Sequence, residues 1–298
     1  MKRIFVVSLF IPSFVSYLIS SVFRRTLKVT GANKGIGYGI VKTLAHNVTN
    51  GVIYLTARDK SRGEAALQEL KKELDGKSHS ELRFHQLDIT DKKSVEEFKA
   101  YLRKEHDGFD VLVNNAGFAF KHNATEAAVV QARVTIGVNY EGTKQVCDAL
   151  FPLIRNGGRV VNVASQMGLM KRDRYSEEII KKMTNPNLTV QGIEEFCNDY
   201  IKAAEENKRK ERGYPESAYC VSKTALAALT FIQAKEMKAR DIIVNACCPG
   251  YVNTDMTSHK GPLTIEEGAD TPAYLATLED KEPCGKFVYL RKVIDFVC

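Results

Sequence analysis

From residue 26 onward, short apolar runs rich in β-branched residues alternate with longer stretches in which apolar residues recur at helical spacing. Seven short runs predict strands. Most of them are apolar at nearly every position, as expected for parallel strands that helices cover on both faces. The pattern therefore predicts an α/β fold with a doubly wound parallel sheet of seven strands. The predicted strands are Thr26–Thr30, Val52–Ala57, Leu82–Leu87, Asp110–Asn114, Arg159–Ala164, Ile242–Cys247 and Lys286–Leu290.

Two features depart from this rhythm. Lys28 stands in the middle of the first predicted strand, where burial on both faces is expected, and so argues against that strand. Residues 166–218 interrupt the alternation just before the longest predicted helix, and we expect them to form a helical insertion. Within them, apolar residues recur at helical spacing with Glu and Lys between, which predicts an amphipathic helix lying on the main domain. These residues are Ile193, Phe196, Cys197, Tyr200, Ile201 and Ala204.

The chain begins with an uncharged run, residues 4–23, which has basic pairs on both sides. This length is sufficient to cross a hydrocarbon core. No small-residue cleavage site follows, so the run predicts an uncleaved membrane anchor rather than a removable signal peptide. The alternative is an N-terminal segment with no membrane role. Either interpretation divides the chain into residues 1–25 and a folded domain of residues 26–298.

Composition narrows the class of protein. The chain is 44% hydrophobic and 27% charged, which is typical of a soluble globular domain. Its net charge of +7 comes without an arginine-rich patch interleaved with aromatics, so we expect no nucleic-acid partner. The seven cysteines include no C-x-x-C pair, which indicates neither a zinc site nor a disulfide framework. Free thiols favour a cytoplasmic location for residues 26–298, and we take the endoplasmic reticulum as the membrane in which the run would anchor them.

A glycine-rich turn follows the first predicted strand and precedes a helix. Its sequence is TGANKGIG, with Gly31 suited to a tight turn, Gly35 to close approach of phosphates and Gly37 to close packing of helix on sheet. The free amides and dipole of a helix N-terminus attract the pyrophosphate of a dinucleotide. Strand, turn and helix in this order therefore predict a Rossmann-type cofactor site.

The residues after the second strand indicate which dinucleotide binds. An NAD site usually has an acid at this point, which holds the ribose 2′-hydroxyl. Here the position is Ala57, followed by Arg58, and Lys34 lies in the glycine turn. Two cations and no acid favour a 2′-phosphate, so we predict NADPH. The neighbouring Asp59 leaves NAD open as the alternative.

The glycine turn, the NNAG sequence of Asn114–Gly117 and the YCVSK sequence of Tyr219–Lys223 together resemble the short-chain dehydrogenase/reductase family. The resemblance covers about residues 26–298. Further blocks are similar to the monomeric carbonyl reductases: LTARD at residues 55–59, NACCPGYVNTDM at residues 245–256, and the 53 residues between Ser165 and Tyr219. The resemblance to the carbonyl reductases implies reduction of ketones, aldehydes or quinones by NADPH. It also implies a monomer, because residues 166–218 would cover the helices through which many relatives dimerise.

The resemblance also implies the site residues. The catalytic set would be Asn139, Ser165, Tyr219 and Lys223, with Asn139 anchoring a water that leads to Lys223. Ser165, Met167 and Tyr251 would contact the substrate. The cofactor residues would be Gly31, Asn33, Lys34, Gly35, Ile36, Gly37, Arg58, Asp88, Ile89, Asn115, Ala116, Gly117, Tyr219, Lys223, Val252 and Thr254.

The expected chemistry is proton transfer coupled to hydride transfer. A phenol with an ordinary pKa of about 10 is a slow acid–base group near neutral pH. Tyr219 and Lys223 lie four residues apart on a predicted helix and so share one face. We therefore expect the ammonium and the oxidised nicotinamide to lower the pKa of Tyr219, and Ser165 to bond the carbonyl oxygen.

Other interpretations stay open at this point. A cofactor-binding sensor or scaffold without turnover would keep the fold, although it would be expected to lose the Ser, Tyr and Lys that are intact here. An NAD-dependent alcohol dehydrogenase would use the same residues in the opposite direction. Cys248, at the end of the sixth strand, is either an inert packing residue or a reactive thiol beside the cofactor.

Overall fold

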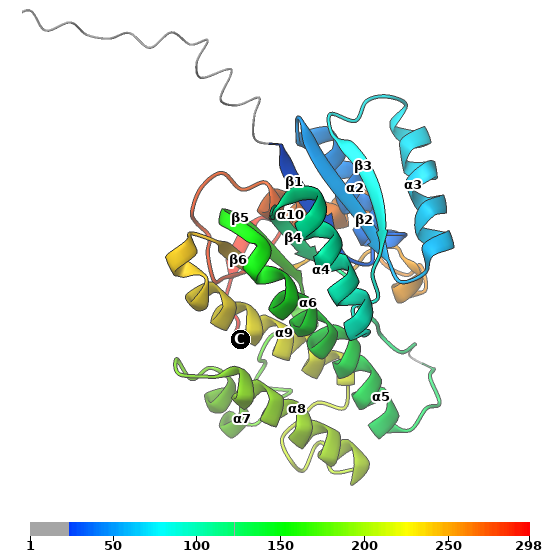
Figure 1. Cartoon of the computed structure of the whole chain (residues 1–298). Coiled ribbons are helices and arrows are strands. Elements are labelled where there is room, and N and C mark those ends of the chain that lie inside the picture. Colours follow the sequence, from blue (N-terminus) through cyan, green and yellow to red (C-terminus); the bar gives the residue numbers. More distant parts are fainter. Residues whose placement is uncertain (1–23, 122) are drawn as a thin grey trace, which may run out of the picture.

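The sheet lies at the centre of the protein, with strand order β3-β2-β1-β4-β5-β6-β7-β8 (Figure 1). A computed structural model describes residues 24–121 and 123–298. Each neighbouring pair from β3 to β7 is parallel, and β8 runs antiparallel to β7. The strands are β1 (Arg25–Val29), β2 (Gly51–Ala57), β3 (Glu81–Gln86), β4 (Phe109–Asn114), β5 (Ile154–Val163), β6 (Ile243–Cys248), β7 (Phe287–Tyr289) and β8 (Lys292–Ile294).

Helices cover both faces of the sheet, as in a doubly wound fold (Figure 1). One core joins the sheet to α2, α3 and α10, and the other joins it to α4, α6 and the end of α9. The helices are α2 (Gly35–Asn47), α3 (Lys60–Leu74), α4 (Lys92–His106), α5 (Ala128–Ile136), α6 (Thr143–Leu150), α7 (Glu177–Met183), α8 (Val190–Glu205), α9 (Ala218–Glu236) and α10 (Ile265–Ala276), with a π-helical turn η1 (Gly137–Gly142) between α5 and α6.

All seven predicted strands form, and β8 adds an eighth that was not predicted. Leu290 and Arg291, with φ of 48° and 59°, make the tight turn that joins β7 to β8. Consecutive positive φ angles match the right-handed twist of a two-residue hairpin. The eighth strand has only three residues and is largely exposed, so it leaves no apolar run for the pattern to detect.

The expectation that Lys28 argues against the first strand is wrong. β1 pairs with β2 and β4, and Lys28 lies inside it opposite Tyr54 and Leu112. The side chain is fully buried, and its Nζ lies 3.7 Å from the centroid of the Phe109 ring. Burial lowers the pKa of this amine well below its usual value, despite the nearby carboxylate of Asp110. A shift in this direction favours the uncharged amine, which an apolar layer accommodates at a lower cost.

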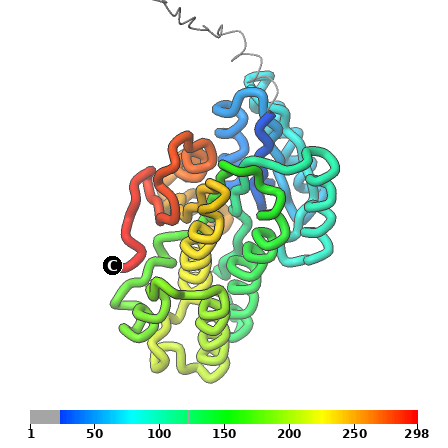
Figure 2. Tube along the Cα trace, turned by 60° about the vertical axis from the view of Figure 1, so that its left-hand side comes forward, coloured from blue at the N-terminus to red at the C-terminus, as the bar shows by residue number. Residues whose placement is uncertain are grey.

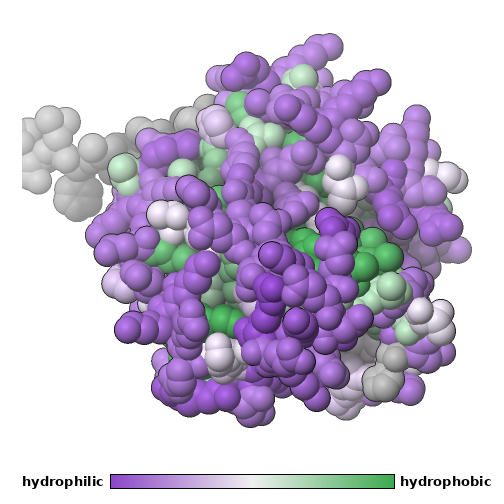
Figure 3. Space-filling view, turned by 90° about the horizontal axis from the view of Figure 1, so that it is seen from below, coloured by the Kyte–Doolittle hydropathy of each residue, from purple (hydrophilic) through white to green (hydrophobic). Residues whose placement is uncertain are grey.

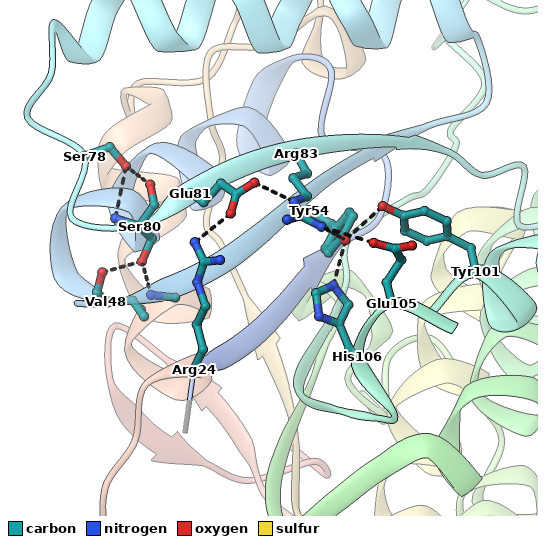
Figure 4. Close-up of polar contacts among 11 residues, drawn as sticks. Arg24, Val48, Tyr54, Ser78, Ser80, Glu81, Arg83, Tyr101, Glu105 and His106 are labelled. Atoms are coloured by element: carbon teal, nitrogen blue, oxygen red, sulfur yellow. Dashed lines mark hydrogen bonds and ion pairs between the residues drawn. The ribbon is translucent and has the colours of Figure 1, made fainter. Parts of the chain in front are cut away.

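Polar side chains from β2, β3 and α4 meet around the Tyr54 hydroxyl (Figure 4). The Tyr54 hydroxyl on β2 lies 2.7 Å from His106 Nε2 and 3.1 Å from the Tyr101 hydroxyl, and Arg83 Nη1 on β3 donates to it at 3.3 Å. Arg83 in turn pairs with Glu81. These contacts satisfy the hydrogen bonding of the buried Tyr54 hydroxyl. None of them involves the Lys28 amine, which has no hydrogen-bond partner among the described residues.

The helical insertion lies beneath the main domain, on α5 and α9 (Figure 2). It contributes α7 and α8, and the apolar stripe predicted in this segment faces inward. Ile193, Phe196 and Tyr200 of α8 pack in one core with residues of α5 and α9. Thr189 caps the helix by accepting the amide of Gly192. A second tie is the Tyr175 hydroxyl, 2.9 Å from Thr224 Oγ1 on α9.

Within the described ranges, no helix is long and apolar enough to cross a membrane. The predicted anchor, residues 4–23, lies outside those ranges, since the description starts at Arg24. The described residues lead directly into β1, at the amino end of the strands.

Candidate active site

The glycine turn lies between β1 and α2 and touches the end of β4. Gly31 and Gly35 have φ of 60° and 57°, a region that favours glycine. A Cβ on Gly31 would lie 2.8 Å from the Cα of Ala116, and one on Gly37 would lie 2.4 Å from Asn115 Nδ2. The close approach of these two chain segments therefore requires glycine at both positions.

Asn115 holds the glycine turn in place. Its Nδ2 donates to the carbonyl oxygens of Thr30 and Gly31 at 2.9 and 3.1 Å. In return, Thr30 Oγ1 accepts the amides of Asn115 and Ala116, both at 3.0 Å. The NNAG sequence thus shapes the phosphate turn from the neighbouring strand. A direct contact of Asn115 with the cofactor stays a prediction.

The amino end of α2 suits an anionic group. In this described helix, the Lys34 side chain makes no capping hydrogen bond and the first turn carries no acid. Its first amides therefore remain available as donors, and the helix dipole adds positive potential at the same point. The pyrophosphate of a dinucleotide fits this cradle.

The end of β2 agrees with a 2′-phosphate. Asp59 is the N-cap of α3, and its carboxylate accepts the amide of Arg62 at 2.9 Å. The only acid at this strand end is therefore used in capping. Arg58 is exposed, and among the described residues it makes no ion pair. Lys34 instead pairs with Asp255 at 2.6 Å, so its predicted contact with the phosphate would require this pair to open.

Three of the predicted catalytic side chains converge at the carboxyl end of β5. Ser165 follows that strand, while Tyr219 and Lys223 lie on the first turns of α9. Lys223 is 4% exposed, its Nζ donates to the Val163 carbonyl at 2.8 Å, and it lies 5.8 Å from the centroid of the Tyr219 ring. Burial lowers the pKa of Lys223 to about 8. Its charge is therefore set by pH close to the physiological range.

The pKa of Tyr219 moves in the opposite direction from the expected one. Burial raises it to about 12, and the neighbouring Ser165 hydroxyl only partly offsets that rise. In the protein alone, Lys223 is not among the groups that shift this pKa, and the loss of solvation outweighs the Ser165 hydrogen bond. The lowering expected from the ammonium together with the oxidised nicotinamide stays a prediction. A raised pKa keeps the phenol protonated, which is the form needed to donate a proton.

Asn139 lies in η1, where the helix between β4 and β5 widens by one residue. Its Oδ1 accepts the Phe118 amide at 2.7 Å, and its Nδ2 donates to the Phe118 carbonyl and to Ser222 Oγ, both at 2.9 Å. A Cβ on Gly117 would lie 3.2 Å from Asn139 Oδ1 and 3.5 Å from Lys223 Nζ. Asn139 is therefore beside Lys223, and its water-binding role stays a prediction.

The other predicted cofactor residues lie on segments that follow the strands. Asp88 Oδ1 accepts the Thr90 amide and hydroxyl, and Ile89 is buried against η1. Val252 is buried, and Thr254 Cγ2 would lie 3.4 Å from a Cβ on Gly35. The segment after β6 thus faces the glycine turn. The contacts of these residues with a dinucleotide stay predictions, as do those of Asn33, Ile36 and Ala116.

Two predicted substrate residues border the same end of the sheet. Met167 and Tyr251 are 41% and 53% exposed, which is compatible with the mouth of a site. Cys248, by contrast, is buried, and its Sγ accepts the Gly250 amide at 3.3 Å. Burial raises the pKa of this thiol. A thiol with a raised pKa is a poor nucleophile, which favours the packing interpretation.

The sequence analysis missed several charged residues near the glycine turn. Lys121 and His259 both contact Asp255, which also receives Lys34. All four are exposed polar side chains without a recognisable spacing. The one available signal was position, because Asp255 directly follows the predicted cofactor residue Thr254.

A phosphate cradle beside a Ser, Tyr and Lys cluster defines a dinucleotide-binding α/β protein with acid–base groups at the carboxyl end of its sheet. A family profile described as "short chain dehydrogenase" matches residues 25–177 and 208–262. The chain belongs to this family. The unmatched gap falls inside the helical insertion and contains α8.

Individual relatives agree with this assignment. The chain is 42% identical over 270 residues to carbonyl reductase [NADPH] 3 of Mus musculus, covering 89% of this chain and 95% of that protein. It is 42% identical to carbonyl reductase [NADPH] 1 of Homo sapiens, covering 89% and 96%. Among solved structures, salutaridine reductase from Papaver somniferum has a TM-score of 0.79 at 30% identity, covering 89% of this chain and 99% of its own. The family predicted from the motifs is confirmed.

Proposed function

We propose that this protein is an NADPH-dependent carbonyl reductase that converts ketones, aldehydes or quinones to alcohols. The observation that carries the proposal is the convergence of Ser165, Tyr219 and Lys223 beside a glycine cradle suited to a dinucleotide. Relatives at 42% identity that carry the names of NADPH-dependent carbonyl reductases support both the reaction and the cofactor.

Each side chain has a defined part in the reaction. The bound cofactor would supply the hydride. Ser165 would donate a hydrogen bond to the carbonyl oxygen and hold it near the phenol of Tyr219. Tyr219 would then donate the proton that the developing alkoxide requires. Its pKa of about 12 keeps this proton in place until the substrate takes it.

The selection of NADPH would depend chiefly on Arg58. A guanidinium can bond a phosphate with two parallel donors, and the nearby Asp59 is used in capping α3. Lys34 is the second predicted cation, although it faces Asp255. Met167 and Tyr251 would line the substrate entrance, as the exposure of both side chains supports.

The direct test is consumption of NADPH when a quinone such as menadione is added to the purified protein. Absorbance loss that depends on the quinone supports the reductase, and comparison with NADH measures the cofactor preference. Binding of NADPH without consumption across a graded set of carbonyl compounds would support a sensor or scaffold. Faster oxidation of alcohols with NAD than reduction with NADPH would support a dehydrogenase.

The monomeric state is part of the same proposal. The faces of α5 and α9 that the insertion covers are not available for a second subunit. Figure 3, seen from the side of α7 and α8, has a mostly hydrophilic surface broken by small apolar areas. Light scattering on residues 26–298 tests the proposal, and a stable dimer or tetramer would contradict it.

The cytosolic location and the anchor at residues 4–23 also remain proposals. Free thiols within the described ranges, five of them buried, suit a reducing compartment. Fractionation and protease protection of the full-length chain, tagged at the C-terminus, test both. Full-length protein in the supernatant would exclude the anchor, and a protected tag would place the catalytic domain in the lumen.

A further inference from the structure

Asp255 lies where three separate segments of the chain meet. Its Oδ2 accepts Lys34 Nζ from the glycine turn at 2.6 Å. Its main-chain carbonyl accepts Lys121 Nζ from the segment after β4, and Lys121 also donates to Ser258 Oγ at 3.1 Å. His259 Nε2 lies 3.0 Å from Asp255 Oδ1. We name the set Lys34, Lys121, Asp255, Ser258 and His259 the Asp255 joint.

Each of the three segments carries residues predicted to bind the cofactor. Lys34 belongs to the turn Gly31–Gly37. Lys121 follows the NNAG sequence that holds this turn. Asp255 follows Thr254, whose Cγ2 would lie 3.4 Å from a Cβ on Gly35. The joint therefore links the elements on either side of the cradle, outside the predicted cofactor contacts other than Lys34.

The loop that presents Asp255 has an unusual backbone. Ser258 and His259 are consecutive non-glycine residues with φ of 54° and 57°. Such conformations are costly and persist where the surrounding contacts determine them. Here the contacts are the Lys121 bond to Ser258 and the bond between His259 Nδ1 and Asn253 Oδ1, at 2.9 Å. Contacts within the Asp255 joint and with Asn253 therefore hold residues 258 and 259 in this conformation.

The joint is also easily broken. The Lys34 and Asp255 side chains are 64% and 59% exposed, and exposed ion pairs contribute little to stability. A weak bridge is a poor brace for a fold, whereas it suits a contact that must open and close with each exchange of cofactor. In many enzymes, release of a product or opening of a loop over the site limits the rate of turnover.

We propose that Asp255 is a positioning residue that holds the three cofactor-binding segments together around NADPH, and that opening of the Asp255 joint sets the rate at which the dinucleotide leaves. This inference rests on the proposed NADPH-dependent function. It makes Asp255 act through Lys34 and Lys121 rather than through contact with the reacting atoms.

The experiment measures dissociation of NADPH and of NADH from the full-length protein by stopped-flow fluorescence, with an excess of competing nucleotide. Asp255→Asn keeps the shape of the side chain and removes its charge. We expect both dissociation rates to rise about two- to fivefold, the range for an exposed ion pair. The two rates should rise in the same proportion, because the joint does not touch the 2′-phosphate in this arrangement. The double variant Lys34→Met/Asp255→Asn should release NADH no faster than Asp255→Asn alone, because both substitutions break the same ion pair.

The matched control is Asp241→Asn. Asp241 pairs with Lys281 at 3.0 Å with similar exposure, precedes β6 whereas the cofactor segment follows it, and has a φ of 54° that asparagine tolerates. It should leave both rates unchanged. In the protein free of cofactor, Asp255→Asn should also speed hydrogen exchange of amides 253–260, with no change in melting temperature.

Two results would overturn the inference. Unchanged dissociation rates would show that the joint does not retain the cofactor. Tighter binding of NADPH alone would show that Asp255 merely competes with the 2′-phosphate for Lys34. Neither result is confused with failure of the proposed function, because in that case the unsubstituted protein itself would not bind NADPH.

Discussion

The two buried lysines, Lys28 and Lys223, lie at opposite ends of the sheet and differ in what their amines meet. Lys28 lies on β1 over the Phe109 ring and, among the described residues, has no hydrogen-bond partner. Lys223 lies on α9 and donates to the Val163 carbonyl at 2.8 Å. Burial lowers the pKa of both, well below the usual value for Lys28 and to about 8 for Lys223.

The comparison separates burial from function. A lowered lysine pKa alone is a common sign of an active site. Here it occurs once beside a serine, a tyrosine and a phosphate cradle, and once in an apolar layer whose polar neighbours bond each other. The surroundings of each amine, rather than the size of its pKa shift, indicate which one takes part in chemistry.

The largest expected effect concerns the phenol beside Lys223. Tyr219→Phe removes the proton donor and leaves the ring, so turnover should fall by about 10²- to 10⁴-fold, the usual contribution of a general acid. NADPH affinity should stay close to that of the unsubstituted protein, as measured by fluorescence titration. A Tyr219→Phe protein with unchanged turnover would contradict the catalytic role given to the residues beside Lys223.

The next effect concerns cofactor choice at the same end of the sheet. Arg58→Ala should weaken NADPH binding by about 1.5–3 kcal/mol, the range for a hydrogen bond to a charged group. NADH lacks the 2′-phosphate and should be almost unaffected. Dissociation constants for both cofactors measure this, with Arg62→Ala as a control on the adjacent exposed arginine. Equal weakening of the two cofactors would mean that Arg58 does not contact the phosphate.

A smaller and graded effect should follow pH. Lys223 is protonated below its pKa of about 8, while Tyr219 keeps its proton up to about pH 12. The value of kcat/KM for NADPH reports groups of the cofactor-free protein. It should therefore be level below pH 8 and fall about tenfold per pH unit above it, as the ammonium is lost. A level profile up to pH 10 would show that the charge of Lys223 is not required.

Much of the fold was predictable because parallel strands leave apolar runs and turns leave glycine. The seven strands, the helical insertion and the family were all indicated by such patterns and are confirmed. β8 was missed because three largely exposed residues bury too little surface to leave a pattern. Lys28 was misjudged because the sequence gives a side chain's polarity and not its protonation state.

The site was predictable to a different degree. Motif spacing indicated Ser165, Tyr219 and Lys223, and the structure brings them together. The direction of the Tyr219 pKa shift could not be read from spacing, since it depends on how much water the fold removes from the phenol. The contacts of Asp255 were equally hidden, because they join segments that are 134 and 221 residues apart in the chain.

The last prediction concerns Lys28, the buried lysine whose surroundings indicate packing. Lys28→Met keeps the length of the side chain and removes an amine that lacks a partner. A buried unsatisfied polar group costs about 1–3 kcal/mol, so the free energy of unfolding should rise by a similar amount near neutral pH. Turnover should not change, because the Lys28 amine lies toward the amino end of the strands and Tyr219 lies beyond their carboxyl end. Urea unfolding measures the first quantity, and Lys208→Met, in the exposed segment after α8, should stay within about 0.5 kcal/mol.

The pH dependence of this difference identifies its cause. The folded-state pKa of Lys28 lies below the unfolded value of about 10.4, so the unfolded chain binds the extra proton between these two values. Stability of the unsubstituted protein should therefore rise with pH in that window, by up to about 1.4 kcal/mol per unit from this group. Methionine does not titrate, so the advantage of Lys28→Met should be largest at low pH and shrink as pH approaches the unfolded pKa. An advantage that stays constant with pH would mean that better packing, rather than the buried amine, accounts for it.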